Sequence, residues 1–352
     1  MRRIVGALAI LIILGILGSA AWLYATVGRP YKGYDAPEVF VEIAPGSSPA
    51  AMGRVLAAAG VVPNAPSFRT AVWLRGSGRR LQAGEYRFDA AISPADVVDK
   101  LARGDVYLQP ITFREGLNIR QMAAIFEERG FGTAREFIKA ASNPQAIAEL
   151  DRQATDLEGY LFPDTYTLPR NVTAEQLVSR MVSRFEQSLT PEIREQAAGR
   201  GLSVRQLVAL ASLVEKETGQ ADERPLVAAV YANRLKIGMG LQCDPTVIYA
   251  LERAGRYTGN LTRENLKFDS PYNTYRYAGL PPGPIAAPGL AALQAAANPA
   301  DVPYLYFVSR NDGSHAFAAT LDEHNRNVHQ WQVLYYREKR QKNSQRPTPN
   351  SQ

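Results

Sequence analysis

The chain has 352 residues, of which 46% are hydrophobic, which is enough for two or three domains with their own cores and excludes disorder throughout. The formal net charge of +6 comes from Arg2, Arg3 and the basic tail at residues 337–352, so residues 4–336 are neutral in sum. A neutral body argues against a surface that neutralises phosphate groups, and we expect no nucleic-acid partner.

A long apolar segment opens the chain. Residues 4–27 read IVGALAILIILGILGSAAWLYATV without a charge, and a helix of this length crosses a hydrocarbon layer about 30 Å thick. Two arginines precede it, so the positive-inside rule predicts a single-pass anchor over residues 1–28, with a cytoplasmic N-terminus and an exported body. A cleaved signal peptide is the competing interpretation, because residues 19–21 resemble a cleavage site. The apolar run continues past them, which favours the uncleaved anchor.

Two stretches beyond a polar linker at residues 29–38 resemble each other. Residues 41–61 and 111–131 each predict a strand, a glycine turn and an amphipathic helix closed by a second glycine. The aligned positions are Gly46 with Gly116, Met52 with Met122, Val55 with Ile125, Leu56 with Phe126, and Gly60 with Gly130. The other explanation is a common strand-turn-helix pattern without any repeat.

These stretches predict two small α+β modules, at residues 39–108 and 109–150. In the first, AGEYRF alternates as a strand, and SPADVVDKLARG predicts a helix capped by Ser93 with Pro94 in its first turn. The second module, with its following TAREFIKAAS, resembles the LysM-type glycan-binding modules of cell-wall proteins. Binding or spacing suits these modules better than catalysis, because their helices carry few acids in apolar settings.

Residues 151–336 predict a mixed, mainly helical domain, which makes the fold class α+β. Helices are expected over residues 173–189 and 203–218 and over ERPLVAAVYANRLKIG, which Gly238 ends. LEGYLFPDTYTLP and SPYNTYRYAGLPPGPIAAPG are too rich in proline and glycine for regular structure.

The end of this domain predicts one hairpin and one helix. YLYFVSRNDGSHAFAAT reads as two strands that turn at Asp312 and Gly313. A capping box of Thr320 and Glu323 starts a last helix through Tyr335. The basic polar tail that follows is expected to be disordered and solvated.

The helix over residues 203–218 ends with two acids, in ASLVEKETG. Glu217 falls three and four residues beyond Val214 and Leu213, so it continues the apolar stripe of that helix, whereas Glu215 points elsewhere. A carboxyl beside apolar side chains loses hydration, which raises its pKa and lets it hold a proton near neutral pH. Such a group can protonate a leaving sugar oxygen as a general acid. The alternative is a helix-end glutamate that reaches solvent or pairs with a lysine.

Glycosidases that use water need a second carboxylate about 5 to 9.5 Å from the first. The candidates are Glu158, Asp164, Asp244 and Asp269. Asp244 has a structural explanation as the N-cap of a helix that begins with proline. Tyr160 lies beside Glu158 and could stack on a sugar face or simply pack. No pair stands out from spacing alone.

Other chemistries are poorly supported by the sequence. Cys243 is the only cysteine, so neither an intrachain disulfide nor a cysteine metal cluster is possible. The histidines lack metal-ligand spacing, and His324 and His329 are interpreted as exposed helical residues. No nucleophile elbow, phosphate-binding glycine loop or dinucleotide fingerprint occurs. We therefore expect neither a metal nor a cofactor.

Four separated blocks, with LEGYLFPDTY as a fifth, carry a family resemblance. They are ASLVEKETG, ERPLVAAVYANRLKIGMGLQCDPTVIYAL, SPYNTYRYAGLPPGPIAAPG and YLYFVSRNDGSHAFAATLDEHN. In this order and spacing they resemble the endolytic murein transglycosylases, the membrane-anchored lytic transglycosylases of bacteria, over residues 81–336. The family's catalytic acid is the second glutamate of the E-K-E-T block, which falls on Glu217. Cys243 departs from the pattern, because threonine is common there.

The resemblance implies an enzyme that cuts nascent peptidoglycan strands internally and leaves 1,6-anhydro-N-acetylmuramic acid ends. The 6-hydroxyl of the substrate is the nucleophile, so one carboxyl serves as acid and then base. By role, Tyr272 and Asn273 are candidates for stacking and for acetamido contacts, and Arg234 for substrate carboxylates. Each has a structural alternative, as a residue that fixes a loop or lies on a helix surface.

The implied location is the bacterial inner membrane, with the catalytic body in the periplasm. This makes association with penicillin-binding proteins and other wall-synthesis enzymes plausible, although no sequence patch identifies a partner. Two alternatives stay open: a non-catalytic glycan-binding scaffold, and a muramidase that uses water.

Overall fold

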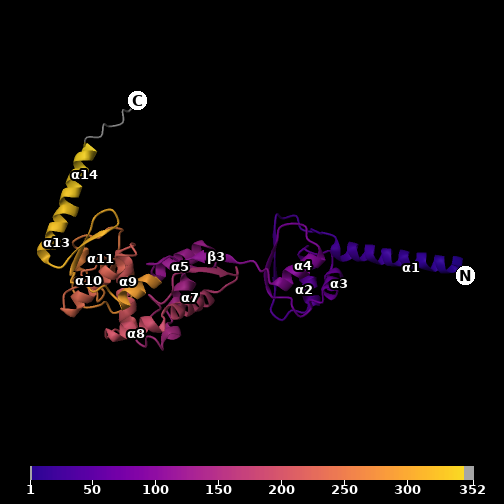
Figure 1. Ribbon diagram of the computed structural model, residues 1–352, viewed down its shortest axis with the longest axis horizontal. Coiled ribbons are helices and arrows are strands. Elements are labelled where there is room, and N and C mark those ends of the chain that lie inside the picture. Colours follow the sequence, from indigo (N-terminus) through magenta and orange to yellow (C-terminus); the bar gives the residue numbers. More distant parts are fainter. Residues whose placement is uncertain (1, 345–352) are drawn as a thin grey trace, which may run out of the picture. The chain divides into compact units, whose positions relative to one another are not determined.

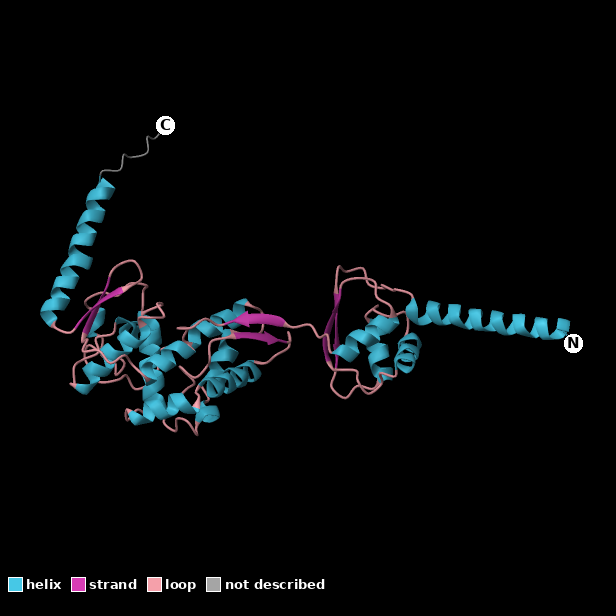
Figure 2. Ribbon diagram, viewed as in Figure 1, coloured by secondary structure: helices cyan, strands magenta, loops and turns pink. Residues whose placement is uncertain are grey.

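The computed structural model describes residues 2–344 and has a mixed α+β fold, mostly helical with a few short strands (Figures 1 and 2). The chain divides into two compact units. The first contains the chain up to Pro110 together with Thr167–Asn171, and the second contains Ile111–Tyr166 and the chain from Val172 onward. The fold class predicted from the sequence is confirmed at this level.

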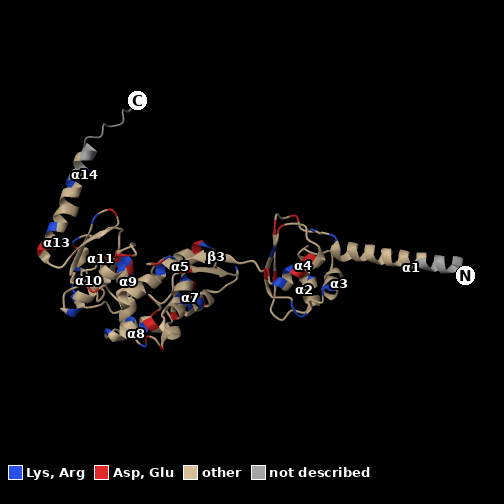
Figure 3. Cartoon of the chain, viewed as in Figure 1, with Lys and Arg blue, Asp and Glu red and all other residues tan. Residues whose placement is uncertain are grey.

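Helix α1, Arg2–Leu23, continues into the π-helical turn Tyr24–Gly28. From Ile10 to its end it carries no charged side chain (Figure 3), and the stretch Ile10–Gly28 is long and apolar enough to cross a membrane. A membrane anchor and a signal sequence both have these properties. At its end Val27 is buried in the core of the first unit.

The first unit is a two-stranded antiparallel sheet covered by helices on one face (Figure 2). Its elements are β1 (Val39–Ile43), α2 (Pro49–Ala58), α3 (Ala65–Arg75), β2 (Gly84–Phe88) and α4 (Pro94–Arg103). The last three residues of each strand are buried, exposed and buried in turn, as expected when one face is covered. The predicted cap is confirmed, because the Ser93 hydroxyl accepts from the Asp96 N–H.

The segment predicted as a linker, residues 29–38, is part of the first unit. Tyr31 and Ile92 exchange backbone hydrogen bonds, and the Gly33 N–H donates to the Gly60 carbonyl.

The second unit begins with the second member of the sequence echo. Its first helices are α5 (Ile119–Glu128) and α6 (Ala134–Ala141). β3 (Gln109–Thr112) pairs with β4 (Thr165–Leu168), and each strand has two residues in each unit. The aligned turn glycines Gly46 and Gly116 have φ of 75° and 77°, and the aligned glycines after the helices, Gly60 and Gly130, have 69° and 75°. Each copy therefore uses the same left-handed turn and helix end. The LysM likeness of residues 109–150 stays a prediction.

The rest of the second unit is a helical assembly around α9 (Figure 1). Its helices are α7 (Ala174–Ser188), α8 (Pro191–Gly199), α9 (Val204–Glu217), α10 (Arg224–Lys236), α11 (Asp244–Arg253) and α12 (Leu290–Ala297). α9 packs against α8, α10, α11 and α12. Residues 207–214 are all buried, so α9 is covered on every side and not only along the predicted stripe.

The C-terminal part contains the predicted hairpin and a longer final helix than predicted. β5 (Tyr306–Ser309) pairs with β6 (His315–Ala318) around the turn at Asp312 and Gly313. α13 (Leu321–Val328) is followed by a π-helical stretch (His329–Leu334) and by α14 (Tyr335–Ser344). The helical conformation thus extends past Tyr335 into the predicted disordered tail, whose residues 345–352 lie outside the described part of the chain.

Candidate active site

Helix α9 delivers Glu217 into the interior of the second unit. Ser203 caps its N-terminus and forms a capping box with Gln206. The buried middle of the helix fixes its axis, and Glu217 is the last helical residue before Thr218 turns to an extended conformation. The acid therefore sits where a rigid element ends at a cavity.

The cavity around Glu217 has a volume of about 280 Å³. Five segments supply its walls: α9, α10, the loop into α11, the irregular loop after Ser270, and the hairpin with α13. The lining residues are Glu217, Arg234, Leu241, Gln242, Asp244, Tyr275, Phe307 and His324.

The carboxyl of Glu217 is surrounded by protein and keeps only partial exposure, toward this cavity. The Tyr231 hydroxyl donates a hydrogen bond to its Oε1 at 2.7 Å, and the Cys243 thiol is a second hydrogen-bond partner. Burial raises the pKa of Glu217, and the nearby Asp244 charge adds to this, while the bonds from Tyr231 and Cys243 oppose it. The group is thus shifted toward the protonated form that a general acid needs.

Glu215, two residues earlier, has a different environment. Its Oε2 accepts from the Gly289 N–H at 2.9 Å, and its Oε1 lies 3.5 Å from the Arg224 guanidinium. Burial raises the pKa of Glu215 as well. Its oxygens are occupied by partners that join α9 to α10 and α12, so its role is structural.

Of the other predicted site residues, Arg234 and Asp244 line the same cavity as Glu217. Arg234 is 8% exposed, and its Nε and Nη1 donate to the carbonyls of Leu305 and Leu241, both at 2.7 Å. These bonds use donors that a substrate carboxylate would otherwise need.

Asp244 does not cap α11 with its side chain, because the helix begins at Asp244 itself and lacks a side-chain cap. Its Oδ1 accepts from the Tyr275 hydroxyl at 2.6 Å, which holds the carboxylate in the cavity wall. The predicted N-cap role of Asp244 is therefore wrong.

Asn273 and Tyr160 are too buried to meet a sugar. Asn273 is fully buried, its Nδ2 donates to the Leu266 and Phe268 carbonyls, and its Oδ1 accepts from the Tyr275 N–H. Tyr160 is 1% exposed, and its hydroxyl donates to Asp151. Asn273 fixes its own loop and Tyr160 packs, which corrects the substrate contacts predicted for both.

Glu158 and Tyr272 belong to a second cluster, apart from the residues around Glu217. Glu158 accepts from the Ile119 N–H and the Tyr249 hydroxyl, both at 3.1 Å, and burial raises its pKa to about 8. It lines a cavity of about 190 Å³. The Tyr272 ring lies 5.0 Å from that of Tyr249, with the Arg253 guanidinium 5.5 Å from the Tyr272 ring centre. Glu158 is therefore not the second carboxylate of the Glu217 cavity.

Sequence reasoning missed several residues at the site. Gln242, Tyr275 and Phe307 line the cavity, and no periodic pattern marks them, since they come from loops and a short strand. His324 is half-buried rather than exposed as predicted. Its ring stacks on Tyr306 at 5.1 Å, and its Nδ1 is buried without a hydrogen-bond partner in the described structure.

The comparisons with known proteins decide the family. Residues 41–330 match the YceG-like family. The chain belongs to this family. This confirms the resemblance drawn from the sequence blocks, since the family's curated relatives carry the name endolytic murein transglycosylase.

Relatives of this YceG-like chain cover most of its length. A Bacillus subtilis (strain 168) protein named endolytic murein transglycosylase is 31% identical over 327 residues, or 88% of this chain and 89% of the relative. A Streptococcus pneumoniae (serotype 2, strain D39 / NCTC 7466) protein of the same name is 30% identical over 320 residues, or 82% of this chain and 58% of the relative. The 2.6 Å crystal structure of the yceG-like protein lmo1499 from Listeria monocytogenes gives a TM-score of 0.57 at 31% identity, covering 82% of this chain and 98% of that one.

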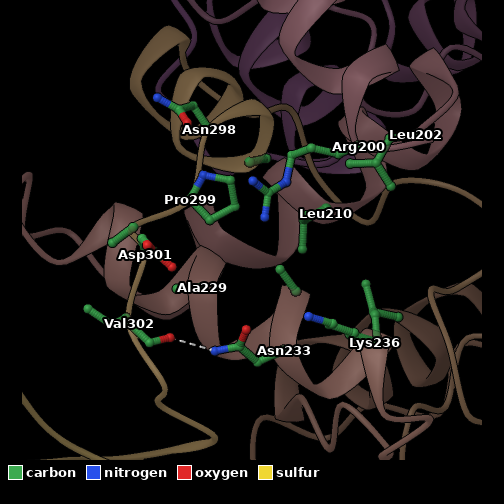
Figure 4. A pocket seen from close by; sticks show the side chains of 14 residues that line it. Arg200, Leu202, Leu210, Ala229, Asn233, Lys236, Asn298, Pro299, Asp301 and Val302 are labelled. Atoms are coloured by element: carbon green, nitrogen blue, oxygen red, sulfur yellow. Dashed lines mark hydrogen bonds between the residues drawn. The ribbon is translucent and has the colours of Figure 1, made fainter.

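A larger cavity of about 690 Å³ in this YceG-like chain lies behind α10 (Figure 4). Its lining includes Ala229, Asn233 and Lys236, whereas Tyr231 and Arg234 serve the Glu217 side. These positions fall on two faces of one helix. Figure 4 shows Asn233 bonded to the Val302 carbonyl, and the Arg200 side chain reaching in from the opposite wall.

Proposed function

We propose that this protein is a peptidoglycan lytic transglycosylase that cleaves the bond after N-acetylmuramic acid within glycan strands, with Glu217 as its acid and base. The observation that carries the proposal is the Glu217 carboxyl, which lines a cavity, is desolvated, and accepts a 2.7 Å bond from Tyr231. The names of the relatives support the substrate class.

The first step is protonation of the leaving oxygen. Glu217 gives its proton to the glycosidic oxygen as the bond from the anomeric carbon to that oxygen breaks. The carboxylate that results keeps the Tyr231 hydrogen bond, which stabilises the new charge on a carboxyl that burial desolvates.

The second step closes the sugar on itself. The 6-hydroxyl oxygen of N-acetylmuramic acid bonds to its own anomeric carbon, and its proton passes to the Glu217 carboxylate. One bond to the anomeric carbon is broken and one is formed, no water is consumed, and Glu217 ends protonated. Because the nucleophile belongs to the substrate, no entropy is lost in capturing a separate molecule.

Glu217→Gln tests the proposal directly. The amide keeps the size of the side chain and accepts from Tyr231, but it has no proton to give, so we expect release of anhydro-ended fragments from purified sacculi to stop. Glu215→Gln is the matched control, since an amide oxygen can still accept from the Gly289 N–H. Continued release by the Glu217→Gln protein would reject the catalytic assignment and favour a non-catalytic glycan-binding scaffold.

A muramidase that uses water is the second candidate, and one observation favours it. Asp244 lies in the Glu217 cavity and could orient a water molecule. Its carboxylate is held by Tyr275, and its charge acts on Glu217. Mass spectrometry of the products separates the two, because a hydrolysed end is heavier by one water than an anhydro end.

The proposed location follows from α1. As an uncleaved anchor it would hold the body at the outer surface of the inner membrane, close to newly made glycan and to wall-synthesis enzymes such as penicillin-binding proteins. Two arginines before the apolar segment support a cytoplasmic N-terminus.

A further inference from the structure

Gln242 combines a backbone conformation that glutamine rarely adopts with a side-chain amide that makes no hydrogen bond within residues 2–344. Its φ is 50°, in the left-handed region. Among the described residues only Asn311 is another non-glycine residue with positive φ, and it lies in the hairpin turn, where asparagine is well tolerated. Glutamine has no such local advantage, so this conformation needs an external cause.

The neighbouring structure holds Gln242 in this conformation from both sides. The Gln242 N–H donates to the Thr274 carbonyl at 3.2 Å, and the Cys243 N–H donates to the Thr274 hydroxyl at 3.0 Å. Just before it, the Leu241 carbonyl accepts from Arg234. Leu241 and Cys243 are each 1% exposed. The backbone on either side of Gln242 is therefore buried and fixed.

The side chain of Gln242, in contrast, is exposed into the cavity that contains Glu217. Within residues 2–344 its amide makes no hydrogen bond. A glycine would fit a φ of 50° better, and no hydrogen bond among the described residues explains a glutamine at this position. Strained residues of this kind persist where the surrounding structure fixes them, and they cluster at functional sites.

We propose that Gln242 determines specificity by reading the 2-acetamido group of a sugar next to the cleaved bond. This inference rests on the proposed function and adds a recognition role to the same cavity. A carboxamide can accept from the acetamido N–H through Oε1 or donate to its C=O through Nε2. Asp244, Tyr275 and Arg234 in the same wall already have partners. His324 Nδ1 has none among the described residues but is buried, so Gln242 is the exposed polar side chain of this wall that is free for the substrate.

The position of the amide relative to the acid supports the acetamido group as its target. The cavity is small, at about 280 Å³, so Gln242 and Glu217 would contact neighbouring groups of the bound strand. On the pyranose ring the acetamido group is carried by C2, and C2 is bonded directly to the anomeric carbon, where cleavage occurs.

The test compares Gln242→Gly with the wild type on two glycan preparations. One is chemically N-deacetylated, and the other is the same material re-acetylated. The measured quantity is the ratio of kcat/KM on acetylated to deacetylated strands. We expect Gln242→Gly to lower this ratio roughly tenfold or more, as loss of a hydrogen bond to a desolvated group would.

Stability separates recognition from a structural role. Glycine suits a φ of 50°, so Gln242→Gly is expected to melt no lower than the wild type, whereas Gln242→Ala loses the same amide and keeps the strain. Both variants should lose the acetyl preference, with Gln242→Ala melting lower than Gln242→Gly. Asn298→Ala, in the larger cavity behind α10, is the control and should change neither quantity.

Two results would overturn the inference: an unchanged acetyl preference in Gln242→Gly, or a melting temperature below that of the wild type together with lost activity. A second measurement compares the affinities of the inactive Glu217→Gln protein and of the Glu217→Gln, Gln242→Gly double variant for the two strand preparations. The ratio of affinities gives the acetyl preference without any cleavage. A failure of the proposed chemistry therefore remains distinguishable from a failure of this inference.

Discussion

Tyr231→Phe should move the pH profile of the enzyme upward. The substitution removes one oxygen, the donor of the 2.7 Å bond to Glu217 Oε1, and keeps a ring that is 1% exposed and packs edge-on against Phe307. The phenol keeps its proton throughout the useful range, since burial raises the pKa of Tyr231 well above 10. The bond favours the ionised carboxylate, so its loss raises the pKa of Glu217.

The size of the shift follows from the kind of bond lost. A hydrogen bond to a charged group contributes about 1.5–3 kcal/mol, and one pKa unit corresponds to about 1.4 kcal/mol. Part of the bond persists to the protonated carboxyl, so the expected upward shift of the Glu217 pKa is about one unit. The ionised state formed in the first step loses the same stabilisation, so kcat on the plateau should fall about tenfold or more.

The assay is kcat against pH, measured from the release of anhydro-ended fragments. The acid works in its protonated form, so its ionisation sets the basic limb of the profile, and this limb should move up by about one pH unit in Tyr231→Phe. Tyr304→Phe is the matched control, because its hydroxyl makes no hydrogen bond among residues 2–344. A basic limb at the wild-type pH, or below it, would refute the assignment of Glu217 as the titrating acid.

Three further outcomes test the framework around the site. Burial raises the pKa of Glu158 from 4.5 to about 8, so the stability it contributes is present below pH 4.5 and is lost as pH rises through about 8. The melting temperature of Glu158→Gln, relative to that of the wild type, should therefore rise as the pH increases from 4.5 to about 8. A constant difference between the two proteins over this pH range would contradict this. Arg205 donates to both Asp151 oxygens, at 2.9 and 3.1 Å. Arg205→Ala removes the cation and leaves the buried carboxylate with hydrogen bonds from Tyr160 and Gln153 alone, so urea unfolding should show a loss of about 3–5 kcal/mol. A loss below about 1 kcal/mol would argue against this ion pair as a source of stability. N-terminal sequencing of the mature protein should find residues before Ser19 retained in an anchored protein, and a start at residues 20–22 would show a cleaved signal peptide.

Periodic segments of the fold could be predicted from the sequence, and segments without a period could not. α7 and α9 carry strong apolar repeats, and both occur close to their predicted ranges. α10 also occurs close to its predicted range, although its buried residues spread around much of the helix. α12 was missed because LAALQAAA is apolar on every face, and its burial comes from contact with α9 and α10. α3 and α8 were missed because their apolar residues show little helical periodicity.

The difference between periodic and irregular segments also explains which site residues could be predicted from the sequence. Glu217 could be predicted because it extends a helical stripe, and that stripe continues into a real cavity. Asn273 could not be assigned, since a polar side chain in an irregular loop serves a ligand or its own backbone, and only its complete burial decides between them. Tyr275 and Gln242 come together through tertiary packing of loops, which leaves no local signal.

Two conflicts with local structural rules meet in the Glu217 cavity, and their coincidence is an independent argument for function. An acid at the last position of a helix opposes the negative end of the helix dipole, which is unfavourable by about 0.3–1 kcal/mol, and burial adds to this. A glutamine at positive φ is unfavourable by about 1 kcal/mol or more. Neither residue gains a compensating contact large enough to explain its presence by stability alone. Selection for stability alone would favour replacing each of these two residues. Glu217 and Gln242 nevertheless line one cavity of about 280 Å³, which points to a role for both in contacting a bound substrate.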